Sequence, residues 1–109
     1  MIVRNAPSHA VFRSDKMGKA DLASADGLFA GLNSFEPGQR HELHTHAGQD
    51  KLYYVLQGCG DVTLGDETGR IGPGDLVLAR SEVPHALANP GPDRLVVMVV
   101  MAPPPAKKG

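Results

Sequence analysis

Short runs of apolar or alternating residues, separated by glycine and proline, extend along the whole chain. No segment keeps the roughly 3.6-residue apolar period of a long helix. Runs of this kind between turn residues predict β-strands, near residues 9–13, 27–35, 40–46, 51–57, 61–65, 69–71, 75–79, 85–89 and 94–101. Polar turns are expected at 65–69 and 72–75, whereas 20–27 fits either a strand or a short helix. The pattern predicts an all-β sandwich or barrel.

The run RLVVMVVM at 94–101 is apolar on both faces of the expected strand. In a simple barrel wall, every second residue would face water and be polar. We therefore expect its outer face to be covered by another sheet, by the N-terminal segment or by a second subunit, and we predict a homodimer. Residues 1–102 are expected to form one domain, and the Pro- and Lys-rich residues 103–109 a flexible tail.

The composition is that of an ordinary globular domain, with 109 residues, 21% charged residues and a net charge of −1. The absence of a basic cluster argues against nucleic-acid binding, which needs a positive surface. No stretch approaches the ~20 apolar residues of a membrane span, so we expect no membrane partner and predict a cytoplasmic location. Cys59 is the single cysteine, which excludes an intramolecular disulfide. A small-molecule ligand is the expected partner.

Two histidines placed two residues apart, His44 and His46, are the first candidates for chemistry. Alternate residues of a strand share a face, so Glu42, His44 and His46 are expected to point the same way. Two imidazoles in such positions can chelate one metal ion. The same alternation predicts that His41 points out of the pocket, as a surface residue.

The surrounding residues extend this histidine pair into two longer motifs. Residues 38–58 read GQRHELHTHAGQDKLYYVLQG, and residues 74–89 read GDLVLARSEVPHALAN. Their spacing resembles the cupin family, whose motifs are written G-x5-HxH-x3,4-E-x6-G and G-x5-PxG-x2-H-x3-N. The resemblance covers residues 38–89 and implies a small single-domain β-barrel of the double-stranded jelly-roll type.

Position by position, the resemblance assigns His44, His46 and His85 to the metal ligands of cupins. It therefore implies a divalent metal ion, which could be zinc, nickel, iron, copper or manganese. Asn89 matches the closing asparagine of the second motif, where we expect a structural cap rather than a metal ligand. The turn glycines of the motifs are matched by Gly38, Gly58 and Gly74.

Three positions depart from the family pattern. Arg80 replaces the proline and Glu82 replaces the glycine, which alters the turn before His85. Lys51 stands where the family has its glutamate ligand. An ammonium about 5 Å from a divalent ion is repelled by roughly 6 kcal/mol at an effective dielectric of ~20, so a charged Lys51 disfavours a bound metal.

Three arrangements reconcile Lys51 with the histidines. In the first, the imidazoles hold the ion alone, and Lys51 bends away or pairs with Glu42 or Asp50. This arrangement leaves coordination positions open for water or substrate, and Glu42 could serve as a fourth ligand or a base. In the second, Asp50 supplies the missing carboxylate, with Gln49 as a weaker, neutral substitute. In the third, the ammonium of Lys51 occupies the place of the ion.

The predicted pocket has polar and apolar walls. Lys51 and Tyr53 share one face of their strand, and Leu87 shares the face of His85. Tyr53 either donates a hydrogen bond to a ligand or fills the barrel wall. We expect metal-dependent chemistry on a small organic ligand such as a carboxylate, of the oxygenase, isomerase or decarboxylase type found among cupins, with Glu42, Lys51 and Tyr53 as catalytic candidates. The alternative is a metal-free cupin that binds a small anion through Lys51.

Overall fold

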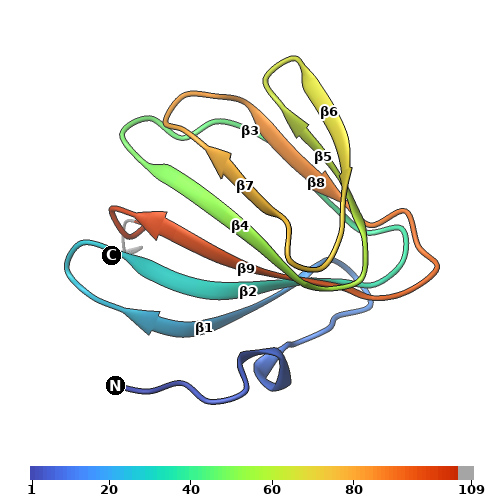
Figure 1. The fold of residues 1–109 in the computed structure, drawn as a ribbon, viewed down its shortest axis with the longest axis horizontal. Helices are drawn as coiled ribbons and strands as arrows, with labels where there is room; N and C mark the ends of the chain where they lie inside the picture. The colour runs from blue at the N-terminus through green and yellow to red at the C-terminus, as the bar shows by residue number, and fades with distance from the viewer. Residues whose placement is uncertain (106–109) are drawn as a thin grey trace.

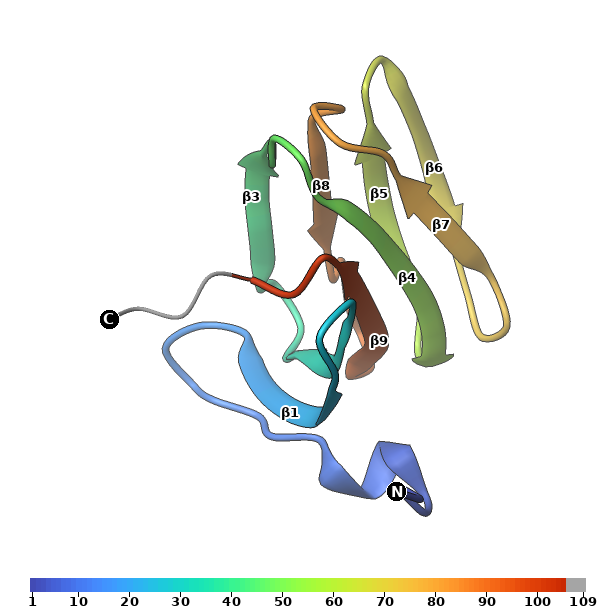
Figure 2. The same ribbon diagram turned by 90° about the vertical axis from the view of Figure 1, so that its left-hand side faces the viewer.

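The computed structural model describes residues 1–105, which form two antiparallel β-sheets packed face to face (Figure 1, Figure 2). One sheet has the strand order β1-β2-β9-β4-β7 and the other the order β3-β8-β5-β6. The architecture is the double-stranded jelly roll that the sequence predicts. The strands are β1 (Gly18–Ser24), β2 (Phe29–Phe35), β3 (Arg40–His44), β4 (Asp50–Gln57), β5 (Gly60–Leu64), β6 (Glu67–Ile71), β7 (Leu76–Ala79), β8 (His85–Ala88) and β9 (Leu95–Ala102).

The core lies between the sheets and is built from every second residue of the facing strands. In β4, the side chains of Lys51, Tyr53 and Val55 are buried, whereas the residues between them are more exposed. The buried apolar cluster comprises Met17, Phe35, Tyr53, Val55, Val62, Ile71, Val77, Leu87, Leu95, Val97 and Val99. Within residues 1–105, Lys51 is the one Lys, Arg, Asp or Glu side chain that is buried.

The predicted strands are present, with ends shifted by a few residues, except near the N-terminus. The prediction of a strand at 9–13 is wrong, because the chain forms a single 3-10 turn, η1, at Ala6–His9. Pro7 lies at the beginning of this turn, where a residue without a backbone N–H loses no hydrogen bond. The chain then passes its backbone at Val11 directly over Gly18, where no side chain would fit. The ambiguous segment 20–27 lies largely in β1.

Helical structure is confined to η1 within the part of the chain that the structure describes. No helix there has the length and the apolar character needed to cross a lipid bilayer. The cytoplasmic location stays a prediction.

The glycines and the asparagine of the two motifs hold the strand connections in place. Asn89 donates hydrogen bonds from its side-chain amide to the carbonyl oxygens of Phe35 and Asp93, at 3.0 and 2.9 Å. This confirms its expected structural role, because it ties the end of β8 to the end of β2 and to the loop before β9. Positive φ angles of 89°, 77° and 90°, which favour glycine, occur at Gly38, Gly58 and Gly74.

The N-terminal segment covers part of the outer face of β9. Phe12 stacks against the guanidinium of Arg94, 4.1 Å from the ring centroid, immediately before this strand. Val96, which lies on the outer face just beyond, is buried. One alternative predicted for the run 94–101 was that the N-terminal segment covers its outer face. This alternative applies to the first residues of β9.

An apolar strip remains on the outer face of the same sheet across β7, β4 and β9. The strand register pairs Leu78 with Leu52, and Leu52 with Val100. Leu76 and Leu78 are 58% and 44% exposed. A surface without charges can pack against its own copy about a two-fold axis, so the homodimer stays our prediction, with this strip as its interface.

Sedimentation velocity at micromolar concentration is expected to give the mass of a dimer. The double variant Leu76→Lys and Leu78→Lys should sediment as a monomer with an unchanged circular dichroism spectrum, because each lysine would bury a charge in the interface. Leu28→Lys is the matched control, since Leu28 is also exposed but lies outside the strip. A monomeric wild type would contradict the prediction.

Candidate metal centre and ligand cavity

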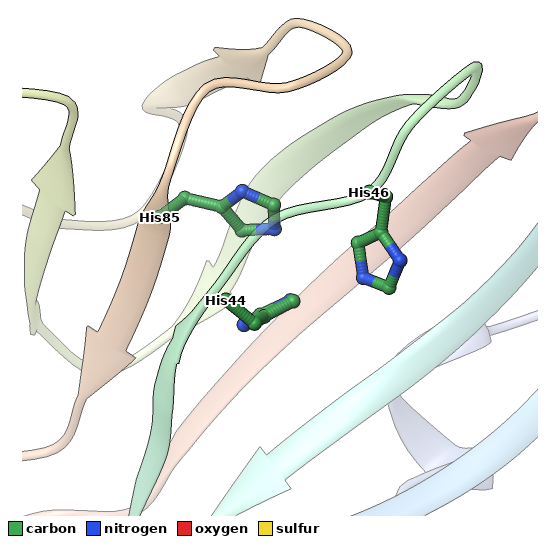
Figure 3. A group of neighbouring side chains, drawn as sticks. All are labelled: His44, His46 and His85. Atoms are coloured by element: carbon green, nitrogen blue, oxygen red, sulfur yellow. The ribbon is translucent and has the colours of Figure 1, made fainter.

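Three histidines, two from neighbouring strands and one from a loop, come together between the sheets (Figure 3). His44 ends β3 and pairs directly with His85, which begins β8. His46 follows in the loop that leads to β4, and the three rings surround a common space. Each residue offers a ring nitrogen within 4.8 Å of those of the other two. These side chains are therefore close enough to hold one metal ion.

Backbone carbonyl groups hold two of the rings in the tautomer that leaves Nε2 unprotonated. Nδ1 of His44 lies 2.7 Å from the carbonyl oxygen of Glu42, and Nδ1 of His85 lies 3.0 Å from that of Val83. A carbonyl only accepts hydrogen bonds, so each Nδ1 carries the proton and each Nε2 keeps its lone pair. Both Nε2 atoms are buried and have no hydrogen-bond partner among the described residues. Their lone pairs are available to a cation.

The surroundings keep these histidines uncharged at neutral pH. Burial lowers the pKa of His44, His46 and His85 below the ordinary value of 6.5, and the nearby ammonium of Lys51 lowers each of them further. Metal ions bind the neutral imidazole. The lowered pKa values therefore favour the neutral form of the three imidazoles, which is the form that binds a metal ion, at neutral pH.

A β-bulge reverses the predicted orientations of His41 and Glu42. The register of β3 against β8 shifts between His41 and His44, which breaks the two-residue alternation. The ring centroid of His41 lies 4.2 Å from that of His44, and burial lowers the pKa of His41 to about 3. The prediction that His41 is a surface residue is wrong, and no local signal in the sequence marks the bulge.

Glu42 accordingly turns away from the cluster. Its side chain is 77% exposed, and Oε1 lies 3.4 Å from Nε of Arg40. The prediction that Glu42 shares a face with His44 and His46 is wrong. In this position Glu42 contributes its backbone carbonyl, rather than its carboxylate, to the site.

Asp50 does not bring its carboxylate to the histidines either. Because Lys51 points inward, its neighbour Asp50 lies on the opposite face of β4. Oδ1 of Asp50 accepts a hydrogen bond from the N–H of Ser81, at 2.8 Å. Within residues 1–105, the group of possible metal ligands contains three histidines and no carboxylate. The arrangement in which Asp50 replaces the family's glutamate is therefore not the one that forms.

Lys51 lies buried near the histidines, and no carboxylate of residues 1–105 forms an ion pair with it. It is 5% exposed, and its Nζ lies 5.3 Å from the ring centroid of Tyr53. None of the ion pairs of the described chain includes it, so the expected pairing with Glu42 or Asp50 is absent. Burial, together with the charge of Lys19, lowers the pKa of Lys51 to about 8, which leaves it mostly charged at pH 7.

Tyr53 belongs to the barrel wall, one of its two predicted roles. It is part of the buried apolar cluster, and its ring centroid lies 6.1 Å from that of His85. Its hydroxyl is buried and has no hydrogen-bond partner among the described residues. Burial raises the pKa of this hydroxyl, so Tyr53 stays protonated at neutral pH.

A cavity of about 930 Å³ opens beside the histidines, a volume typical of small-molecule sites. Polar groups on its surface include Lys19, Asp21, Asn33, His41, His44, His46, Gln49 and Lys51. Its apolar surface includes Phe29, Val99, Met101, Pro103, Pro104 and Pro105. The prolines come from the predicted tail 103–109, and Gln49 holds the first of them by donating to its carbonyl oxygen, at 2.9 Å. Residues 106–109 of that tail lie outside the described part of the chain.

Known proteins resemble this chain in both sequence and fold. The uncharacterized protein SCO3923 of Streptomyces coelicolor is 31% identical over 103 residues, which cover 85% of this chain and 95% of that protein. The crystal structure of TT1209 from Thermus thermophilus matches with a TM-score of 0.91 and 30% identity, covering 96% of this chain and 100% of that one. KdgF from Halomonas sp. matches with a TM-score of 0.77 and 27% identity, covering 84% and 81% of the two chains.

The family itself follows from a sequence match that covers more than half of the chain. Residues 31–101 match the family described as Cupin domain, a segment that contains both motifs and all three clustered histidines. The strand order and the jelly-roll architecture agree with this match. The chain belongs to the cupin family.

Proposed function

We propose that this protein binds one divalent metal ion through ring nitrogens of His44, His46 and His85, and acts on a small organic ligand in the adjacent cavity. The observation that carries the proposal is the pair of Nε2 atoms on His44 and His85, which are buried and have no hydrogen-bond partner within residues 1–105. Their Nδ1 atoms are held by carbonyl oxygens, the arrangement that orients metal-binding histidines in proteins.

The donor set supports a catalytic rather than a purely structural metal. Three protein ligands leave coordination positions open for water or a substrate. Three neutral imidazoles suit zinc, nickel, copper or ferrous iron, whereas manganese prefers carboxylate oxygen. When bound, such an ion polarises a carbonyl group or activates water or dioxygen, which serves oxygenase, isomerase or decarboxylase chemistry. The cavity beside the histidines gives the ligand access to this position.

Elemental analysis of untagged protein tests the metal site directly. Wild type dialysed against a divalent metal is expected to hold about one ion per chain, and His44→Ala less than about a tenth of that, because two imidazoles retain such ions poorly. His9→Ala is the matched control and should bind as wild type does, since His9 is exposed and lies in η1. Little metal in wild type, with strong uptake in Lys51→Glu, would overturn the proposal.

The metal-free, anion-binding alternative draws on a different observation. Lys51 is buried and unpaired within the described chain, so an anion would complete its interactions. The elemental analysis separates the two functions, because only the first requires the histidines to hold an ion.

A further inference from the structure

The cavity carries an excess of positive charge before any metal ion binds. Its surface includes two ammonium groups, of Lys19 and Lys51, and one carboxylate, of Asp21. The whole chain has a net charge of −1, so the positive excess is local to the cavity. Lys51 is only 5% exposed, so its charge is less screened by water than that of an exposed lysine and attracts anions more strongly.

The carboxylates near Lys51 in sequence are already engaged elsewhere. Glu42 lies beside Arg40 on the outside of β3, and Asp50 accepts from the N–H of Ser81. A buried charge without a partner is unfavourable. A bound anion would provide this partner, and a carboxylate forms short, charge-assisted hydrogen bonds with an ammonium.

The remainder of the cavity surface indicates what the anion is attached to. Phe29, Val99 and Met101 present apolar surface, which Pro103–Pro105 extend. An inorganic ion would leave these side chains against water, whereas a carbon skeleton would cover them. The apolar wall thus fits the carbon skeleton of a ligand, and the ammonium of Lys51 fits a carboxylate of the same ligand.

We infer that the cavity binds a small organic acid, whose carboxylate pairs with Lys51 and whose carbon skeleton lies against Phe29, Val99 and Met101. Lys19, which is exposed, adds attraction at the edge of the cavity without contacting the carboxylate. The inference rests on the proposed function for the location of the site, but the pairing with Lys51 does not require a bound metal ion.

Calorimetric titration of the chelator-treated protein at pH 7 tests this pairing. The probes are acetate, butyrate and benzoate, each compared with its primary amide. Wild type is expected to bind each acid at least about tenfold more tightly than the amide, with affinity rising from acetate to benzoate as apolar area increases. Lys51→Met should lose the preference for the acid, and Lys19→Met, the matched control, should keep most of it.

Three outcomes would overturn the inference: equal binding of acids and amides, a preference that persists in Lys51→Met, or inorganic phosphate that binds more tightly than benzoate. Metal content is a separate readout. A protein that takes up metal but does not prefer acids loses this inference and keeps the proposed function. A protein that prefers acids but holds no metal keeps the inference and loses the proposed function.

Discussion

Replacing Lys51 with glutamate is expected to raise the affinity for a divalent metal ion by roughly 1000-fold at pH 7. Lys51 has a pKa of about 8, and in the absence of a bound anion a metal ion nearby favours the form of Lys51 that has lost its proton. At pH 7 this proton loss lowers the affinity of the wild type about tenfold. A glutamate removes that cost and adds an anionic ligand at the family's usual position, which contributes roughly another hundredfold.

Two further variants separate these contributions in a competition titration with a chromophoric chelator. Lys51→Met should bind about tenfold more tightly than wild type, because it removes the charge without adding a ligand. The wild-type affinity should rise with pH up to about 8, where Lys51 loses its proton, whereas Lys51→Met should show no such rise. Lys19→Glu makes the same charge change at an exposed position and should have a much smaller effect. Equal affinities of Lys51→Glu and Lys51→Met would contradict the prediction.

The Lys51→Met substitution is also expected to stabilise the metal-free protein by about 3 kcal/mol at pH 7. Burial lowers the pKa of Lys51 from 10.5 to about 8. Between these two pH values the unfolded chain holds a proton that the folded protein has lost, so the stability of the wild type rises with pH there. Below pH 8 both states are protonated and the full cost of the buried charge persists. Methionine has a similar length and no charge, so it removes this cost.

Urea unfolding at pH 7 and at pH 10.5, followed by circular dichroism, measures the effect. The advantage of Lys51→Met should be largest at pH 7 and should shrink toward pH 10.5, because the wild-type lysine is then neutral in the folded state. Lys19→Met should stay within about 0.5 kcal/mol of wild type, as expected for an exposed side chain. Equal stabilities of wild type and Lys51→Met at pH 7 would show that the folded protein solvates or pairs this ammonium.

These two predictions concern one side chain, Lys51, which is expected to be unfavourable both for metal binding and for stability. Lys51 is predicted to weaken metal binding and to destabilise the fold, because the described chain offers its buried charge no ion-pair partner. Groups that disfavour the folded state without a compensating contact occur at functional sites. The organic acid proposed above supplies such a contact.

Local sequence patterns were sufficient to predict most of the strands, and the resemblance to cupins implied the histidine cluster. The segment 51–57 alternates between core and outer positions as β4 does, because side-chain direction in a strand depends only on the residue's place in the alternation. Turn glycines such as Gly38 and Gly74 mark strand ends, since their positive φ angles disfavour other residues. The resemblance of the two motifs to those of cupins implied His44, His46 and His85, which the fold brings together.

Other features depend on contacts between segments that are distant in sequence. The bulge in β3 is a property of its pairing with β8, and it exchanges the predicted positions of His41 and Glu42. The carboxylate of Asp50 accepts a hydrogen bond from the backbone N–H of Ser81, 31 residues away in the sequence. Lys19 reaches the cavity from the edge strand β1. A local pattern specifies the alternation of side chains, but register, hydrogen-bond partners and cavity walls arise only when strands pair and sheets pack.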